Sequence, residues 1–380
     1  MKTIVFISIF FIVFFRIPVF YTGIYLSLFL GFFASFFLLQ KNIRRFFLNA
    51  LGLNLLVVFF TITIFALAID ISTGALINNL TNAFTLRASM IVVMSALPAL
   101  FVVWFFVKNE GVKLSKIVYW AFAGQLVFWL YTFFVPGGKD FIYALMAMSN
   151  SVNIIHEWNY YTRGFGYAVE INYTSPFVMV LTAFTLLGVR LLSLATLVTQ
   201  IFNSNNVAVA LLMGMLTRGT KNNVVKVFFG IATFILTVSV LVFFYSDYLP
   251  TRLQAELNSG GTRTIGYLLE NHFIFLNTGW FEVLFGTGNY LFQSGHKISV
   301  DSGWVILVNY GGLFFTSLVF IFLFLLSFRA FDNKFISLIW FSAGLWLNFK
   351  GLLFSPNAYL FMLFLFLFHR LYKRKIVAKE

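Results

Sequence analysis

Most residues of this 380-residue chain that could carry out chemistry fall in two polar stretches, residues 136–176 and 246–302. The two stretches hold three of the four histidines, together with Arg163, Arg252 and Arg263. Guanidinium groups stay charged and bind phosphate through paired hydrogen bonds. The three arginines therefore predict an anion site, and a lipid-linked diphosphate is an anion that would lie at the depth of a membrane surface.

Glycines accompany these arginines. Gly164 and Gly166 closely follow Arg163, and Gly286 and Gly288 lie in the second stretch. Because glycine lets a ligand approach the backbone closely, we expect these four residues to shape the loops, although turns also use glycine freely. Arg163 has an alternative role, since it lies among aromatic residues: it could reach lipid phosphates from an interfacial aromatic belt.

Transfer of a sugar from such a diphosphate would need a base that takes a proton from the acceptor hydroxyl. The preferred candidates are Asp301 and His296. Asp301 stands just before an apolar run, where an acid is costly unless it is paired or hydrated, and its alternative role is a helix N-cap. The other candidates on the same side are His156, Glu157, His272 and Glu282.

Arginines near a departing diphosphate would stabilise its negative charge, a role that elsewhere often belongs to a metal ion. The chain has no cysteine and no DxD or HExxH motif. We therefore expect neither a dedicated metal site nor another cofactor.

The rest of the sequence predicts the frame that carries the two stretches. Hydrophobic residues make up 61% of the chain and charged residues only 10%, against about 25% charged in an ordinary soluble domain. These values exclude a soluble globular protein, a disordered chain and an outer-membrane barrel. We predict an all-α polytopic membrane protein with about 12 transmembrane helices, or about 10 if short ones do not span. The expected spans are residues 3–15, 19–39, 46–69, 88–107, 117–135, 177–189, 191–202, 207–217, 224–245, 303–327, 335–348 and 358–368.

The distribution of basic residues predicts the orientation of the chain. With the N-terminus inside and the spans alternating, 18 of the 26 Lys and Arg residues lie on the inner side, and 9 of the 12 acidic residues lie outside. This pattern meets the positive-inside rule with both termini in the cytoplasm. The net charge of +14 is then mostly a topology signal, and we expect no nucleic-acid partner. Residues 136–176 and 246–302 become two long outer loops of a single membrane domain, residues 1–380.

The order of these motifs resembles that of the O-antigen polymerases (Wzy type) and, more distantly, that of the O-antigen ligases. The resemblance covers about residues 150–315 and the overall hydropathy profile, and it depends on order and spacing more than on any single motif. The matching residues are Arg163–Gly166, Asn172–Pro176, Asn203–Asn206, Arg252, Arg263, Phe285–Gly288, Asp301–Trp304 and Gly311–Gly312.

The resemblance implies a multi-pass enzyme of the bacterial inner membrane with a C-type glycosyltransferase-like fold and two long periplasmic loops. Such an enzyme transfers a growing glycan from undecaprenyl diphosphate to the sugar end of a lipid-linked repeat unit at the periplasmic face. Arg163, Arg252 and Arg263 would hold the diphosphates. The implied partners are undecaprenyl-diphosphate-linked oligosaccharides and the lipid bilayer, together with a chain-length regulator and a flippase.

Two alternative functions are a ligase-like glycosyltransferase and a flippase or transporter for lipid-linked oligosaccharides. The ligases carry His-Asn where this chain has Asp301-Ser302, and they tend to carry Ser-Arg where it has Asn205-Asn206. Both differences favour a polymerase, and they leave the base open between Asp301 and His296. A transporter commonly places charges near the membrane midplane, whereas this chain places them in loops on one face.

Overall fold

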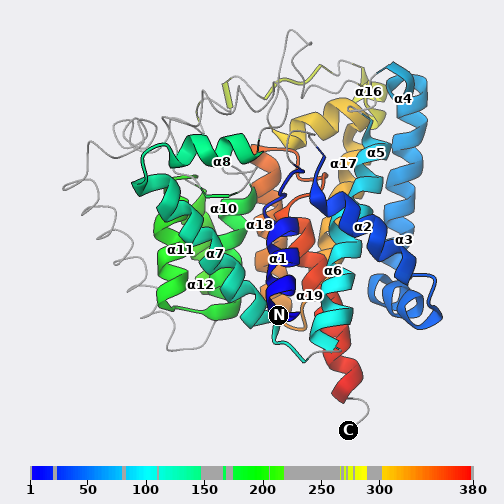
Figure 1. Ribbon diagram of the computed structural model, residues 1–380. Coiled ribbons are helices and arrows are strands. Elements are labelled where there is room, and N and C mark those ends of the chain that lie inside the picture. The colour runs from blue at the N-terminus through cyan, green and yellow to red at the C-terminus, as the bar shows by residue number, and fades with distance from the viewer. Residues whose placement is uncertain are drawn as a thin grey trace. The chain divides into compact units, whose positions relative to one another are not determined.

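The computed structural model of the protein shows a chain of helices (Figure 1) with one isolated bridge between Pro18 and Tyr25 among its described residues. It divides into two compact units: unit 1 is Met1–Phe29 with Phe105–Thr262, and unit 2 is Leu30–Trp104 with Arg263–Glu380. The single membrane domain expected for residues 1–380 stays a prediction. The structure describes residues 2–19, 24–78, 83–108, 111–146, 166–167, 174–204, 206–217, 266, 269–270, 273–276, 279–288 and 302–377.

Unit 1 is built around α7, which packs against α1, α8 and α11. Aromatic side chains fill the contact between α1 and α7, where the ring centroids of Phe14 and Phe122 lie 5.3 Å apart. Helix α10 continues as the π-helical turn η4 and packs against α11 and α12. The elements are α1 (Lys2–Phe14), α7 (Leu114–Phe134), α8 (Gly138–Met146), α10 (Thr174–Thr182), η4 (Ala183–Leu187), α11 (Leu191–Ile201) and α12 (Val207–Leu216).

Unit 2 is built around α17, which packs against α3, α16, α18 and α19. Helix α19 also packs against the continuous helical segment formed by α5, η2 and α6, which leads into η3. The elements are α3 (Lys41–Ser72), α4 (Ala75–Asn78), α5 (Phe84–Ile91), η2 (Val92–Ala96), α6 (Leu97–Phe101), η3 (Val102–Lys108), α16 (Trp280–Phe285), α17 (Gly303–Ala330), α18 (Lys334–Lys350) and α19 (Ala358–Val377). Helix α2 (Leu26–Phe37) and η3 each contribute residues to both units.

The helices follow the apolar runs of the sequence. Every expected span overlaps a helix except 224–245, which lies outside the described residues. Four helical segments in the described part of the chain are long and apolar enough to cross a membrane: Lys41–Ser72, Phe84–Phe105, Leu114–Phe134 and Gly303–Ala330. The described chain therefore has the helical, multi-pass character of a membrane protein, whereas the count of about 12 spans stays a prediction.

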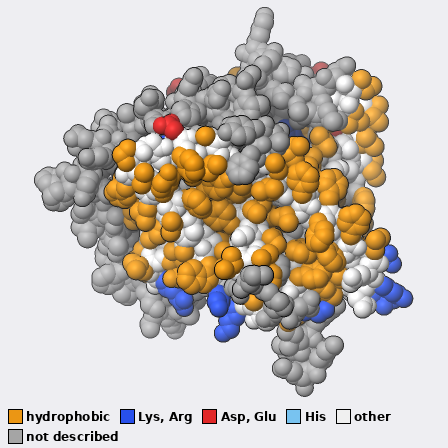
Figure 2. All heavy atoms as spheres, in the orientation of Figure 1, with side chains coloured by type: hydrophobic (Ala, Val, Ile, Leu, Met, Phe, Trp, Pro, Cys, Tyr) orange, Lys and Arg blue, Asp and Glu red, His pale blue; other side chains and the backbone are white. Residues whose placement is uncertain are grey.

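Helix α3 displays the apolar surface expected next to lipid. Leu53, Phe60 and Ile64 follow one face of the helix and are 75%, 59% and 66% exposed, whereas Ile62 and Ala66 on another face are buried. A water-soluble helix would place such an exposed stripe in contact with water. Figure 2 shows hydrophobic side chains over most of the described surface on the face in view.

Helix α3 is interrupted at Gly52, whose φ of 65° and ψ of 160° are not helical. A break in a helix frees carbonyl groups, which must find other donors when water is scarce. Arg329 from α17 supplies these donors. Its Nε donates to the Ala50 carbonyl at 3.2 Å, and its Nη2 donates to the Asn49 carbonyl at 3.3 Å.

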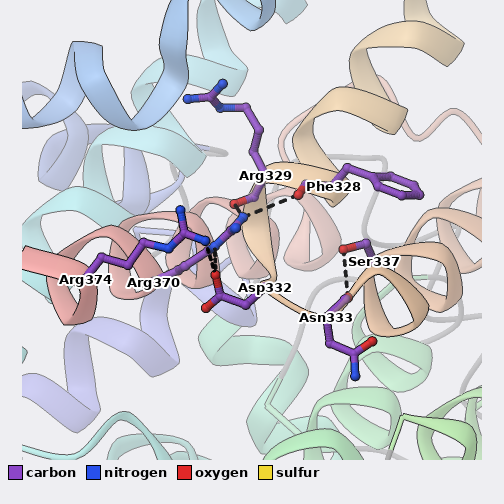
Figure 3. A network of polar contacts seen from close by, with 7 residues as sticks. All are labelled: Phe328, Arg329, Asp332, Asn333, Ser337, Arg370 and Arg374. Carbon is purple, nitrogen blue, oxygen red and sulfur yellow. Dashed lines mark hydrogen bonds and ion pairs between the residues drawn. The ribbon is translucent and has the colours of Figure 1, made fainter. Parts of the chain in front are cut away.

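A second arginine caps the last turn of α17 (Figure 3). Arg370 Nη1 donates to the carbonyl oxygens of Arg329 at 2.6 Å and of Phe328 at 3.4 Å, and its Nε donates to Asp332 at 2.7 Å. Arg374 also pairs with Asp332. Helix α19 thus secures α17, which in turn secures the break in α3.

We predict that Arg329→Ala destabilises the protein by about 1–3 kcal/mol, because the part-buried Ala50 carbonyl is left without its donor. The midpoint of thermal unfolding of the purified protein measures this loss. Lys334→Ala is the control, since Lys334 is exposed at the start of α18, and it should change stability by less than about 0.5 kcal/mol. Equal midpoints for the two variants would contradict the role of Arg329.

Candidate functional site

The structure describes only part of the predicted site. Gly166, Gly286 and Gly288 are described, and their surroundings are given below. The remaining predicted residues, Arg163, Gly164, Arg252, Arg263, His296 and Asp301, lie outside the described residues, so their roles stay predictions. The geometry of the site is therefore the geometry of the segments that anchor the two loops.

The first loop is anchored on α7 through Gly166 and Tyr167. The Tyr167 amide donates to Gln125 Oε1 at 2.9 Å, and a side chain at Gly166 would collide with the Gln125 amide group. The centroid of the Tyr167 ring lies 5.2 Å from that of Phe128 and 6.4 Å from that of Phe11. Burial raises the pKa of the Tyr167 hydroxyl, so it stays neutral at physiological pH. This anchor comes three residues after Arg163 in the sequence.

A polar turn joins α11 to α12 elsewhere in unit 1. Asn203 and Ser204 are buried there, and Asn203 Nδ2 donates to Gln200 Oε1 at 3.0 Å. Buried amides of this kind are costly without partners, and the hydrogen bond to Gln200 offsets part of that cost. The turn corresponds to the Asn203–Asn206 motif of the sequence.

The second loop is anchored on α17 by direct backbone pairing. The Thr287 amide donates to the Asn309 carbonyl at 3.0 Å, and the Gly288 amide donates to the Tyr310 carbonyl at 2.9 Å. Helix α17 is interrupted two residues later at Gly312, with φ 66° and ψ −169°. A break at this point lets helix carbonyls accept hydrogen bonds from the loop.

Glycines on both sides make this close approach possible. A Cβ atom at Gly286, where φ is 78°, would collide with the Tyr310 carbonyl, and one at Gly312 would collide with the backbone of Leu284. Gly288, where φ is 73°, faces Thr73 at the end of α3. The Phe285–Gly288 and Gly311–Gly312 motifs of the sequence therefore belong to one contact.

Asn309 fixes a second part of the same loop. Its Nδ2 donates to the Ile274 carbonyl at 2.9 Å and to the Val305 carbonyl at 2.9 Å, and its Oδ1 accepts from the Leu276 amide at 2.8 Å. Asn309 is fully buried. One side chain thus holds residues 273–276 against α17, beside the contact of residues 286–288.

A buried acid lies behind this contact. Asp70 of α3 is fully buried, and its Oδ2 accepts from the Thr85 amide at 2.9 Å and the Thr85 hydroxyl at 2.7 Å. The Tyr310 hydroxyl donates to Asp70 Oδ1 at 2.7 Å and lies 3.1 Å from the Ala66 carbonyl. With both carboxyl oxygens occupied, Asp70 connects α3, α5 and α17 and has a structural rather than a catalytic arrangement.

The N-terminus of α17 is packed against the end of α18. Ser302, the residue after Asp301, holds the N-cap position and is fully buried. Gly303 faces the Asn348 side chain and the Gly351 carbonyl so closely that a Cβ atom would collide with both. Asn348 Oδ1 accepts from the Leu353 amide at 2.9 Å. Ser302, which follows Asp301 in the sequence, therefore begins a helix whose first turn is closely packed.

Glu282, one of the lesser candidates for the base, has a local role in α16. Its Oε2 accepts from the Gly279 amide at 3.2 Å and so caps the first turn of α16. His156, Glu157 and His272 lie outside the described residues. Within the described part of the chain, no group of three His, Asp or Glu side chains is placed to hold a metal ion. The expectation of a metal-free site stays a prediction.

Sequence reasoning missed Gln125, Asn309 and Asp70, because it looked for chemistry in the loops. Each is a polar residue inside or at the end of an apolar run. Such a residue is costly in a membrane helix unless it has a partner, and this was the available signal. Comparison of the chain with protein families, with curated proteins and with solved structures finds no match.

We predict that Gly286→Ala weakens the second anchor more than strain alone does. Gly137→Ala is the matched control, since Gly137 has φ 75° and nothing within 4 Å of an added Cβ atom. The control should cost about 1–3 kcal/mol from backbone strain, and Gly286→Ala should cost more because of the added collision. Thermal unfolding measures the cost, and hydrogen exchange at the Thr287 and Gly288 amides should speed up only in Gly286→Ala. Unchanged exchange there would contradict the anchor.

Proposed function

We propose that this protein is a membrane glycosyltransferase that elongates a surface polysaccharide. It would transfer a growing glycan from undecaprenyl diphosphate to the sugar end of a lipid-linked repeat unit on the outer face of the membrane. The observation that carries the proposal is the pairing of Phe285–Gly288 with Asn309–Gly312. Two motifs of the O-antigen polymerase resemblance, separated in the sequence, meet in this contact.

An enzyme with a lipid-linked donor and acceptor needs a protein surface that lipids can reach. The exposed apolar stripe of α3 provides such a surface. It also needs polar loops at the level of the headgroups, positioned by the membrane helices. In unit 1 the buried amide side chain of Gln125 holds the loop segment that contains the motif residue Gly166. In unit 2 the buried amide side chain of Asn309 holds residues 273–276, beside the main-chain contact of the motif residues 286–288. This arrangement supports loops with a defined position.

In the proposed reaction, the bond between the donor sugar and the diphosphate breaks, and the acceptor hydroxyl forms the new glycosidic bond. Arg163, Arg252 and Arg263 would stabilise the negative charge that develops on the departing diphosphate. Asp301 or His296 would take the proton of the acceptor hydroxyl. Asp301 directly precedes the buried Ser302 at the start of α17.

We expect Arg163→Ala and Arg263→Ala to abolish the ladder of long lipopolysaccharide chains in a polymerase-null strain, because the diphosphate loses its charged partners. Arg→Lys at either position should restore only part of the ladder, since lysine keeps the charge and loses the paired hydrogen bonds. Gel analysis of lipopolysaccharide is the measurement. Arg44→Ala, at an exposed arginine of the predicted cytoplasmic side, is the control. Normal ladders from both loop variants would refute the proposed site.

A second prediction concerns the purified protein. Incubated with a defined undecaprenyl-diphosphate-linked repeat unit, it should form dimers and longer products, with the same yield when a chelator removes divalent metals. Mass spectrometry of the lipid-linked products is the measurement. Loss of elongation with chelator, regained on adding a metal, would contradict the metal-free mechanism but leave the polymerase function intact.

The same strain and assay separate the alternatives. A polymerase null leaves lipopolysaccharide capped with one repeat unit, whereas a ligase null leaves no repeat unit attached. A flippase would move the lipid-linked sugar across liposomes without lengthening it. Either result would replace the proposed polymerase by the other function.

A further inference from the structure

We propose that Arg329, Arg370 and Arg374 form a binding site for the phosphate headgroup of an anionic phospholipid at the predicted cytoplasmic end of unit 2. Their side chains line an open pocket of about 280 Å³ between the ends of α3, α17 and α19. Figure 3 shows how Arg370 and Arg374 converge on Asp332 while Arg329 extends toward the neighbouring helix. This site is independent of the outer loops and of the proposed transferase activity.

The pocket carries a surplus of positive charge. Asp332 is the acid that pairs with Arg370 and Arg374. Desolvation favours its neutral form, but the hydrogen bonds and charges of the two arginines outweigh this effect and hold the pKa of Asp332 below its ordinary value. Asp332 therefore counts as one negative charge at neutral pH, against three guanidinium groups. An anion in the pocket would reduce the remaining repulsion.

The arginines keep donors for such an anion. Arg374 uses only Nη2 in its hydrogen bond with Asp332, and Arg370 uses Nε and Nη1. The other guanidinium nitrogens of these two residues have no hydrogen-bond partner among the residues that the structure describes. Two guanidinium groups can bind one phosphate through several charge-assisted hydrogen bonds.

The remaining pocket wall indicates a lipid rather than a free phosphate. Phe328, Leu367 and Leu371 line the pocket beside the arginines. A phospholipid has both a charged headgroup and acyl chains, so it can use the cations and the apolar wall together, whereas inorganic phosphate can use only the cations. Basic pockets between helices on the cytoplasmic side are suited to anionic lipid headgroups.

A similar combination occurs in unit 1, where Lys116 and Arg190 line an open pocket of about 250 Å³ together with Tyr119 and two leucines. A measurement of total bound lipid would therefore sum the binding at both pockets. The test therefore compares two variants of the unit 2 pocket, one that removes a positive charge and one that removes a negative charge. Lipid binding at this pocket should fall in the first variant and rise in the second.

The experiment measures lipid binding to the purified full chain by native mass spectrometry, with phosphatidylglycerol and phosphatidylcholine of identical acyl chains. The wild-type protein should bind phosphatidylglycerol more tightly than phosphatidylcholine. Arg374→Gln should weaken phosphatidylglycerol binding about fivefold, the effect of one cation near a lipid surface. Asp332→Asn removes the competing acid and should strengthen it. A role limited to holding the helices together predicts no gain from Asp332→Asn.

Lys373→Gln is the matched control, because Lys373 is exposed on the same helix and does not line the pocket. It should change phosphatidylglycerol binding less than Arg374→Gln does. Equal losses in the two variants would show diffuse attraction and overturn the site, as would equal binding of the two lipids to the wild type. Inorganic phosphate at millimolar concentration should not displace phosphatidylglycerol, and complete displacement would assign the pocket to free phosphate.

Discussion

Every backbone N–H and C=O group in the apolar core of a membrane has to be hydrogen-bonded within the protein, because no water is available there. Unit 2 breaks two of its long helices and supplies hydrogen-bond donors at the two breaks in different ways. At Gly52 a side chain from another helix, Arg329, supplies the donors. At Gly312 the amides of a loop segment supply them, through Thr287 and Gly288. The arrangement of helices and loop in this unit follows from the hydrogen bonds at these two breaks.

The hydrogen bonds at both breaks involve α17. Its C-terminal turn carries Arg329 and is capped by Arg370, and its N-terminal half carries Asn309, Tyr310 and Gly312. The hydrogen bond between Tyr310 and Asp70 adds a buried polar link to α3, in a place where an unpaired acid would be costly. Within unit 2, the same helix is thus fixed at both ends to α3, and it presents the anchor of the second loop.

Much of the fold was predictable because hydropathy marks where the chain can contact lipid. The span expected at residues 303–327 begins where α17 begins, since polar residues precede Gly303. The helices extend beyond the expected spans 46–69 and 358–368, since α3 begins at Lys41 and α19 continues to Val377. Charged residues end a lipid-facing surface but do not end a helix, because the helix keeps its internal backbone hydrogen bonds where it extends into water.

The site was less predictable because its contacts join distant parts of the chain. The glycines at 166, 286 and 288 were expected to shape the loops by letting a ligand approach the backbone, and the structure gives each a close protein neighbour. The hydrogen bonds around these glycines do not follow from local sequence, because they join distant residues. Gln125 and Tyr167 are 42 residues apart, and Asp70 and Tyr310 are 240 apart. A lone polar residue in an apolar run signals that a partner exists, but only tertiary packing decides which one.

The anchor of the second loop has a consequence for how this chain can vary. The contact joins main chain to main chain through glycines at a few positions, with one added hydrogen bond from the Thr287 hydroxyl to the Asn309 carbonyl. Substitutions elsewhere in the loop can therefore leave its attachment to α17 unchanged, and under the proposed function they would adapt the loop to a different glycan.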